Sequence, residues 1–342
     1  MNEQLHNQIA GLEILRSLAA SDKMPPQGAV ALANASVVTP SASDWTRFLS
    51  QFLLSVGTTL ALSGVVFFFA YNWAELGRFA KFALLEGCIV LTVLGAWRLG
   101  NRMSGRALLA TAMILVGPLL AVYGQTYQTG ADPYELFLGW ALITLPWVIL
   151  ARMPVLWMIF LLLLNIALIL FWAQVVALAG EFGDSIPMYL ALAMLNILPW
   201  IVWELLHRRG LSWVMVRWPP KLMAVSSFAI LVMCMCVILL GVATDPVWYS
   251  VVAGVIAFSA AISSMYYFRF ILPDLFIVAV TLASIMVVVT VGLGRFLFDV
   301  VDADIGGVLV LGMIVVGEVA AAGHWLRKEA HVTNARDRGE TL

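Results

Sequence analysis

The sequence predicts an all-α, polytopic membrane helix bundle of about ten transmembrane helices. Hydrophobic residues make up 62% of the 342 residues and charged residues only 11%, whereas soluble domains carry roughly 25% charged residues. The mean hydropathy is +0.96, and apolar runs of membrane-spanning length repeat from Leu49 onward. These runs lack the period-two alternation of a transmembrane β-barrel, so we expect helices.

Ten apolar runs are long enough for a helix to cross about 30 Å of hydrocarbon at about 1.5 Å per residue. Short breaks rich in Gly, Pro, Asn, Asp or charge separate them, and such breaks are turn and helix-start signals. The fourth run is short and has to borrow residues from its flanks, so nine or eleven spans stay open. The predicted transmembrane domain covers residues 49–326, with spans at 49–71, 82–99, 107–123, 135–150, 155–173, 188–206, 222–242, 249–267, 275–292 and 307–326.

The segments outside the spans are predicted to be cytoplasmic. Residues 1–48 are too polar to insert, and apolar residues recur at helical spacing before the Pro25-Pro26 break, which predicts a small helical hairpin and linker. Its apolar stripe has three possible contacts: the second helix of the hairpin, the membrane surface or a partner. Residues 327–342 are charged without an apolar pattern, which predicts a disordered tail.

The distribution of basic residues predicts the orientation of the chain. If the N-terminus is cytoplasmic, the cytoplasmic segments hold all but three of the 19 Lys and Arg residues. The three on the opposite side are Arg78, Lys81 and Arg295. Because cytoplasmic loops carry an excess of Lys and Arg, this asymmetry predicts an even number of spans with both termini inside.

Two carboxylates within the predicted spans are candidate functional residues. Glu318 lies deep in the last span, and Glu86 lies about one turn inside the second. A charged residue at the centre of a bilayer costs about 2.5–3.5 kcal/mol on insertion scales, so such residues mark ion or proton paths by default. The structural alternative for Glu318 is a protonated carboxyl that is hydrogen-bonded to a neighbouring helix.

Two asparagines, Asn165 and Asn196, form the second candidate pair. They are equally far from the turn that joins the fifth and sixth predicted spans, so antiparallel packing places them at the same depth. We expect an interhelical amide pair that contributes about 0.6 kcal/mol. The alternative is a polar substrate site at mid-membrane.

The stretch FFFAYNWAELGRFAKFALLE and the later stretch AVYGQTYQTGADPYELFLGWALITLPW carry a family resemblance. With an Asn-Trp corner and a Gly-Gln-Thr-Tyr corner of the Gly-Gln-Tyr type, they resemble the bacterial membrane-protein family known as domain of unknown function 2157, over roughly residues 45–172. The resemblance implies a bacterial inner-membrane location and partnership with neighbouring gene products, including a periplasmic protein that bears a Gly-Asp-Tyr motif. The family has no activity to transfer. We therefore take the two corners as candidate outer contact sites, at Asn72, Trp73, Gln125, Tyr127 and Asp132.

Several function classes find no support in the sequence. No basic patch for nucleic acid, Ser/His/Asp set, HExxH or phosphate-binding motif occurs. Cys88, Cys234 and Cys236 lie in apolar runs and are interpreted as packing residues. We therefore expect no enzyme activity, no cofactor and no metal, and rank an intramembrane enzyme third.

Two function hypotheses remain. The first is a scaffold or assembly component of the inner membrane, working with a periplasmic protein and another multipass membrane protein. The second is a secondary transporter or lipid-handling protein, with Glu318 and Glu86 lining a path. A polar cavity containing either carboxylate would favour transport, and a filled interior would favour the scaffold.

Overall fold

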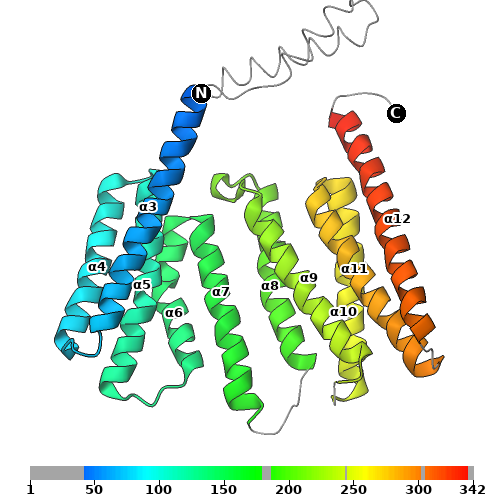
Figure 1. Ribbon diagram of the computed structural model, residues 1–342, viewed down its shortest axis with the longest axis horizontal. Helices are drawn as coiled ribbons and strands as arrows, with labels where there is room; N and C mark the ends of the chain where they lie inside the picture. The colour runs from blue at the N-terminus through cyan, green and yellow to red at the C-terminus, as the bar shows by residue number, and fades with distance from the viewer. Residues whose placement is uncertain (1–41, 179–185, 243–244, 302–304, 338–342) are drawn as a thin grey trace, which may run out of the picture. The chain divides into compact units, whose positions relative to one another are not determined.

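The computed structural model describes residues 42–178, 186–242, 245–301 and 305–337, and every long element in these ranges is a helix (Figure 1). An all-α fold is therefore confirmed for the described part of the chain. The chain divides into two units, Met1–Leu76 and Gly77–Leu342. Residues 1–41, which hold the predicted N-terminal hairpin, lie outside the described residues.

The first unit contributes one long helix, α3 (Ala42–Asn72), to the described residues. This helix contains the whole of the predicted first span, 49–71, and begins within the segment predicted as a linker. Neither Gly nor Pro occurs between residues 41 and 56, so nothing in the sequence interrupts helix formation ahead of Leu49.

The second unit contains nine helices that are long and apolar enough to cross a membrane, counted over the described residues. Each of the remaining predicted spans falls on one of them. Three of the helices continue into π-helical turns, and a short 3-10 turn, η2 (Ser212–Val214), lies between α8 and α9. The helices are α4 (Arg78–Leu99), α5 (Met103–Tyr127), α6 (Pro133–Ala151), α7 (Pro154–Phe171), α8 (Ile186–Arg208), α9 (Trp218–Leu239), α10 (Val247–Tyr266), α11 (Leu275–Arg295) and α12 (Ile305–Asp337), and the π turns are η1 (Trp172–Val176), η3 (Tyr267–Ile271) and η4 (Phe296–Val300).

Helices α5 and α12 are among those that extend beyond their predicted ends. Helix α5 runs to Tyr127 instead of ending at residue 123, and Gln128 closes it in the left-handed conformation at φ 46°. Helix α12 runs to Asp337, so residues 327–337 are helical where the sequence predicted disorder. No Gly or Pro occurs between Gly323 and Asp337, and the Ala, Lys, Arg and Glu residues of this segment are good helix formers.

The dipeptide Gly117-Pro118 is a packing site within a continuous helix. A Cβ atom at Gly117 would lie 2.3 Å from the ring of Trp140, so the indole of α6 occupies the space that this glycine leaves. The same indole donates a 2.7 Å hydrogen bond from Nε1 to the carbonyl oxygen of Met113. This contact fixes α5 against α6, and α5 continues through Pro118.

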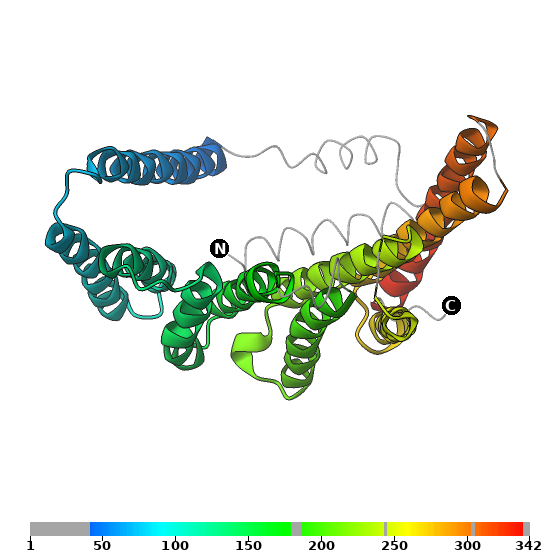
Figure 2. The same ribbon diagram turned by 90° about the horizontal axis from the view of Figure 1, so that it is seen from below.

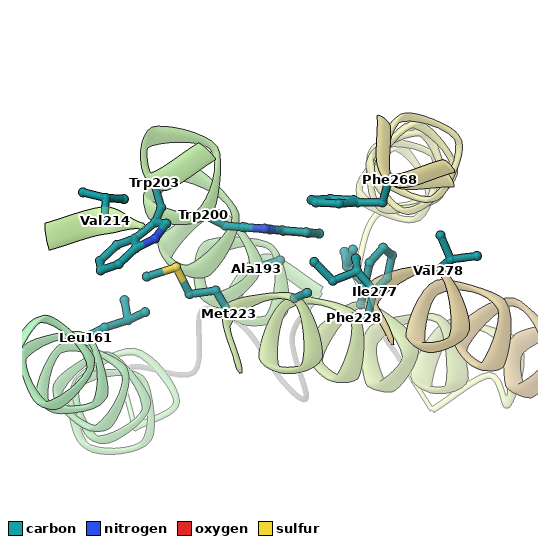
Figure 3. Close-up of a cluster of buried hydrophobic side chains, with 12 residues drawn as sticks. Leu161, Ala193, Trp200, Trp203, Val214, Met223, Phe228, Phe268, Ile277 and Val278 are labelled. Atoms are coloured by element: carbon teal, nitrogen blue, oxygen red, sulfur yellow. The ribbon is translucent and has the colours of Figure 1, made fainter. Parts of the chain in front are cut away.

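The main core of the second unit surrounds α9, which contacts α7, α8, α10 and α11. Figure 3 shows two tryptophans of α8 that point in different directions, Trp203 toward Val214 and Met223 and Trp200 toward Phe268. The rings of Trp200 and Phe268 are stacked, with centroids 5.6 Å apart and planes at 7°. Phe228 of α9 packs edge-on against Trp200, so aromatic side chains from α8, α9 and η3 fill this core.

Consecutive helices of the second unit run in alternating directions, so their ends form two layers of turns (Figure 1). One layer contains the ends of α8 and α10 and the starts of α9 and α11, together with most of the described basic residues. The other layer is tied by two charged groups. Asp245 accepts a 2.9 Å hydrogen bond from the amide of Ile186, and Arg295 donates to the carbonyl oxygen of Leu239 at the end of α9.

Candidate functional site

A cavity of about 390 Å³ lies between α8, α9, α10 and the π turn η3. Figure 2 shows α8 and α10 on the same side of α9. The cavity is a hollow between these helices that is open on one side, where Ile201, Leu205 and Tyr266 are exposed. Most of the lining is apolar or aromatic, for example Ile197, Leu231 and Tyr266. Pockets for small ligands typically measure about 300–1,000 Å³ and have this character, so the cavity is a candidate binding site.

One face of α8 supplies much of the cavity wall. Ile197, Trp200, Glu204 and Arg208 all line the cavity and are spaced by three or four residues, so they lie above one another on the helix. At about 1.5 Å per residue, the eleven steps from Ile197 to Arg208 correspond to about 16 Å of depth. The wall changes along this line from apolar to charged.

Two buried donors in the lining have no hydrogen-bond partner. Trp200 is 7% exposed and Ser227 is 1% exposed, and neither the Trp200 Nε1 nor the Ser227 Oγ is paired within the described part of the chain. Both residues line the cavity, from α8 and α9. Both atoms are shielded from solvent behind the cavity surface. Because buried polar groups are nearly always hydrogen-bonded, they become donors to a bound molecule only when their side chains turn toward the cavity.

A cluster of four charges ties α8, α9 and α11 together beside the cavity. Glu204 is 8% exposed, and both of its carboxylate oxygens lie 3.0 Å from Nη1 of Arg217. Asp274 lies 3.6 Å from Arg217 Nη2 and 3.5 Å from Lys221 Nζ, and its carboxylate also accepts the amide of Phe276 at the start of α11. The two acids and two bases neutralise one another.

Glu204 lies near the end of α8, where the sequence alone suggests a side chain that snorkels to the interface, and this cluster shows otherwise. The carboxylate is buried and paired, because the 3-10 turn Ser212–Val214 brings the start of α9 back to the end of α8. The pairing partner, Arg217, is thirteen residues away. Spacing within one helix could not reveal a contact that depends on the path of a turn.

Arg208 completes the charged end of the cavity. Its Nε donates a 2.9 Å hydrogen bond to the hydroxyl of Tyr267, and its Cζ lies 4.6 Å from the centre of the Tyr267 ring. Within the described residues Arg208 has no carboxylate partner, whereas Arg269 of the same layer pairs with Glu329 at 3.0 Å. The charged end of the cavity therefore carries an excess positive charge.

The predicted amide pair is present between α7 and α8. Asn196 Nδ2 donates a 2.7 Å hydrogen bond to Asn165 Oδ1, and Asn196 is 2% exposed. A third member that the sequence does not predict is Ser226 of α9, whose hydroxyl donates a 3.2 Å hydrogen bond to Asn196 Oδ1. These three side chains form a polar link across α7, α8 and α9. A substrate site at this link stays a prediction.

The two candidate carboxylates lie apart from the cavity. Glu318 of α12 is half-buried and accepts a 2.9 Å hydrogen bond from the hydroxyl of Thr290 on α11. A hydrogen bond to a neighbouring helix is what a structural role for Glu318 predicts. Glu86 is exposed on α4. Neither residue lines the cavity.

The candidate outer corners occupy helix ends. Asn72 is the last residue of α3, and Trp73 begins the connection to α4. Gln125 and Tyr127 are exposed on the last turn of α5, and Asp132 is exposed at the N-cap of α6. The last three residues therefore flank one inter-helix turn.

Fold and site together define a multi-pass α-helical membrane protein with a ligand-sized cavity. The model of the family described as predicted membrane protein (DUF2157) matches residues 25–157, so the resemblance to this family is confirmed for that part of the chain. No curated protein and no solved structure matches the sequence. The family match ends within α7, and the residues that line the cavity, from Ile197 to Phe268, lie beyond it.

Proposed function

We propose that the chain is a non-enzymatic, multi-pass protein of the bacterial inner membrane that binds an amphipathic lipid between α8, α9 and α10. The cavity of about 390 Å³ carries this proposal. Its apolar wall suits an acyl chain, and its charged end at Arg208 suits a polar headgroup. The second hypothesis covered both a secondary transporter and a lipid-handling protein. We favour the lipid-handling protein, because a transport path was expected to contain Glu86 or Glu318 and the cavity contains neither.

The proposed topology has ten spans and both termini in the cytoplasm. The layer that holds Arg208 and Arg217 is then cytoplasmic, so the cavity lies in the inner leaflet. The excess of basic residues in this layer supports the assignment. Alkaline phosphatase fused after Leu342 should be inactive and fused after Ala131 should be active, and the reverse pattern would overturn the topology.

A matched pair of variants tests the lipid proposal. Ser263 and Ser259 are exposed serines one turn apart on α10, and only Ser263 lines the cavity. Ser263→Phe should fill the cavity and remove co-purified lipid detected by native mass spectrometry of the full chain. Ser259→Phe should retain the lipid. Equal lipid content in the two variants would contradict binding at this site.

A scaffold role is a second proposal, supported by the family resemblance and by the exposed residues Gln125, Tyr127 and Asp132 around one turn. We expect a periplasmic partner to co-purify with the full chain in detergent and to be lost when both Asn72 and Trp73 are changed to Ala. Retention of the partner by this double variant would exclude the first corner as its contact site.

A further inference from the structure

We infer that the lipid in this cavity carries an oxyanion headgroup, which binds the guanidinium of Arg208. The inference rests on the proposed function and specifies the ligand class for the same cavity. It depends on the balance of charges at the cavity end, on the geometry of Arg208 and on the two unpaired donors deeper in the wall.

The balance of charges favours an anion. Among the described residues that line the cavity, Glu204 carries the negative charge and Arg208 the positive charge. Glu204 already accepts two 3.0 Å hydrogen bonds from Arg217, which lies outside the lining. The remaining charge at the cavity end is the positive charge of Arg208, so a cationic headgroup would be repelled and an anionic one attracted.

The geometry of Arg208 suits an oxyanion. Tyr267 holds the guanidinium through the Nε hydrogen bond and through its ring face, which leaves both terminal nitrogens without a partner in the described part of the chain. A planar guanidinium fork binds phosphate or carboxylate in a bidentate manner. Because Tyr267 orders the side chain beforehand, less conformational entropy is lost when the anion binds.

The deeper donors indicate which amphiphile fits. A phosphodiester lipid and a free fatty acid share an oxyanion attached to an acyl chain, and either would satisfy Arg208. A glycerophospholipid also presents ester carbonyls below its headgroup. These can accept from Trp200 Nε1 and Ser227 Oγ once the two shielded side chains turn toward the cavity on binding. A fatty acid has no acceptor beyond its carboxylate. We therefore assign an anionic glycerophospholipid to the cavity.

The test uses the purified full chain, delipidated in detergent and titrated separately with phosphatidylglycerol, phosphatidylethanolamine and oleate, with native mass spectrometry as the readout. We expect phosphatidylglycerol to bind most tightly. Arg208→Gln should weaken its binding by about tenfold or more, the factor expected when one charge-assisted hydrogen bond is lost. The control is Arg209→Gln, which changes the adjacent exposed arginine outside the cavity lining and should have no effect.

The deeper contacts have a control of the same kind. Trp200→Phe removes the unpaired indole donor in the cavity and should weaken phosphatidylglycerol binding without affecting oleate. Trp203→Phe removes an unpaired indole donor that lines a different, smaller cavity, and should leave both ligands unaffected. Loss of binding in both variants would instead indicate a general packing defect and would overturn the assignment of Trp200.

The possible outcomes separate this inference from the proposed function. Equal binding of phosphatidylethanolamine and phosphatidylglycerol, with no effect of Arg208→Gln, would overturn the anion preference while lipid binding stands. Preferential binding of oleate would keep the oxyanion and overturn the glycerophospholipid. If Ser263→Phe leaves all binding unchanged, the cavity is not the site and both proposals fail.

Discussion

The carboxylate of Glu204 near the end of α8 is held by one nitrogen of the Arg217 guanidinium at the start of α9, at 3.0 Å to each oxygen. The two residues lie on either side of the turn that joins the helices, and the acid is 8% exposed. Because a buried charge without its partner is strongly destabilising, this pair holds the charged end of the cavity in one arrangement.

Breaking this pair from one side should destabilise the protein. Arg217→Met leaves Glu204 buried without its partner, and we expect a loss of about 3 kcal/mol, the lower end for buried pairs because the Arg217 side chain is 26% exposed. The double variant Glu204→Met, Arg217→Met removes both charges and should recover most of the loss. The apparent melting temperature in detergent measures both effects.

An exposed ion pair provides the control. Arg295 and Asp299 pair at 3.2 Å with side chains 41% and 63% exposed, so Asp299→Asn should change stability by less than about 1 kcal/mol. A double variant at 204 and 217 that is as unstable as the single one would show that the loss comes from packing rather than from the unpaired charge.

The asparagine pair should show energetic coupling. A double-mutant cycle with Asn165→Ala and Asn196→Ala should yield about 0.6 kcal/mol, the average for hydrogen bonds between membrane helices. The control cycle combines Asn165→Ala with Thr281→Val, a buried change on α11, and its coupling should be near zero. Reversible unfolding in mixed micelles gives both values, and equal coupling in the two cycles would refute a specific amide pair.

The contact between Gly117 and Trp140 should tolerate no side chain at residue 117. Gly117→Ala places a Cβ 2.3 Å from the indole and should cost about 1–3 kcal/mol through overpacking. Gly139→Ala meets no atom within 4 Å and should be neutral or slightly stabilising, since Ala favours helix over Gly. Thermal unfolding of the two variants makes the comparison, and equal melting temperatures would contradict the close contact.

Glu318 offers a test of structural against functional roles. Glu318→Gln should leave the melting temperature nearly unchanged, because the amide oxygen can accept the hydrogen bond that Thr290 donates. The same change should abolish any proton-coupled activity, since an amide cannot take up the proton. Proton uptake into proteoliposomes loaded with a pH-sensitive dye is the measurement. Uptake at the wild-type rate in the Gln variant would exclude Glu318 as a proton carrier.

Features that depend on local composition or on symmetry about one turn could be predicted from the sequence. The apolar runs are each contained in or overlap a helix, because length and hydropathy alone define a membrane-spanning segment. The pairing of Asn165 with Asn196 followed from their equal distance to the connecting turn. The first prediction needs only composition and length, and the second adds the assumption that consecutive helices are antiparallel.

The cavity could not be predicted in this way. It requires α8 and α10 to lie on the same side of α9, and no spacing within a single helix encodes that arrangement. The helical continuation to Asp337 was not predicted, because its charged composition resembles that of disordered segments. In the structure Glu329 pairs with Arg269, and this ion pair stabilises the helix against its neighbour. Contacts between helices decided both features.

The three π-helical turns occur where α7, α10 and α11 end, at Trp172–Val176, Tyr267–Ile271 and Phe296–Val300. A π turn accommodates one more residue than an α turn, usually as a single local widening inside an otherwise regular helix. A one-residue insertion or deletion at these positions alters how far the helix protrudes while the preceding part keeps the same face toward its neighbours. Bilayers of different thickness can thus be matched at Trp172–Val176 and Phe296–Val300 without repacking the main core, whereas Tyr267–Ile271 contributes Phe268 to that core.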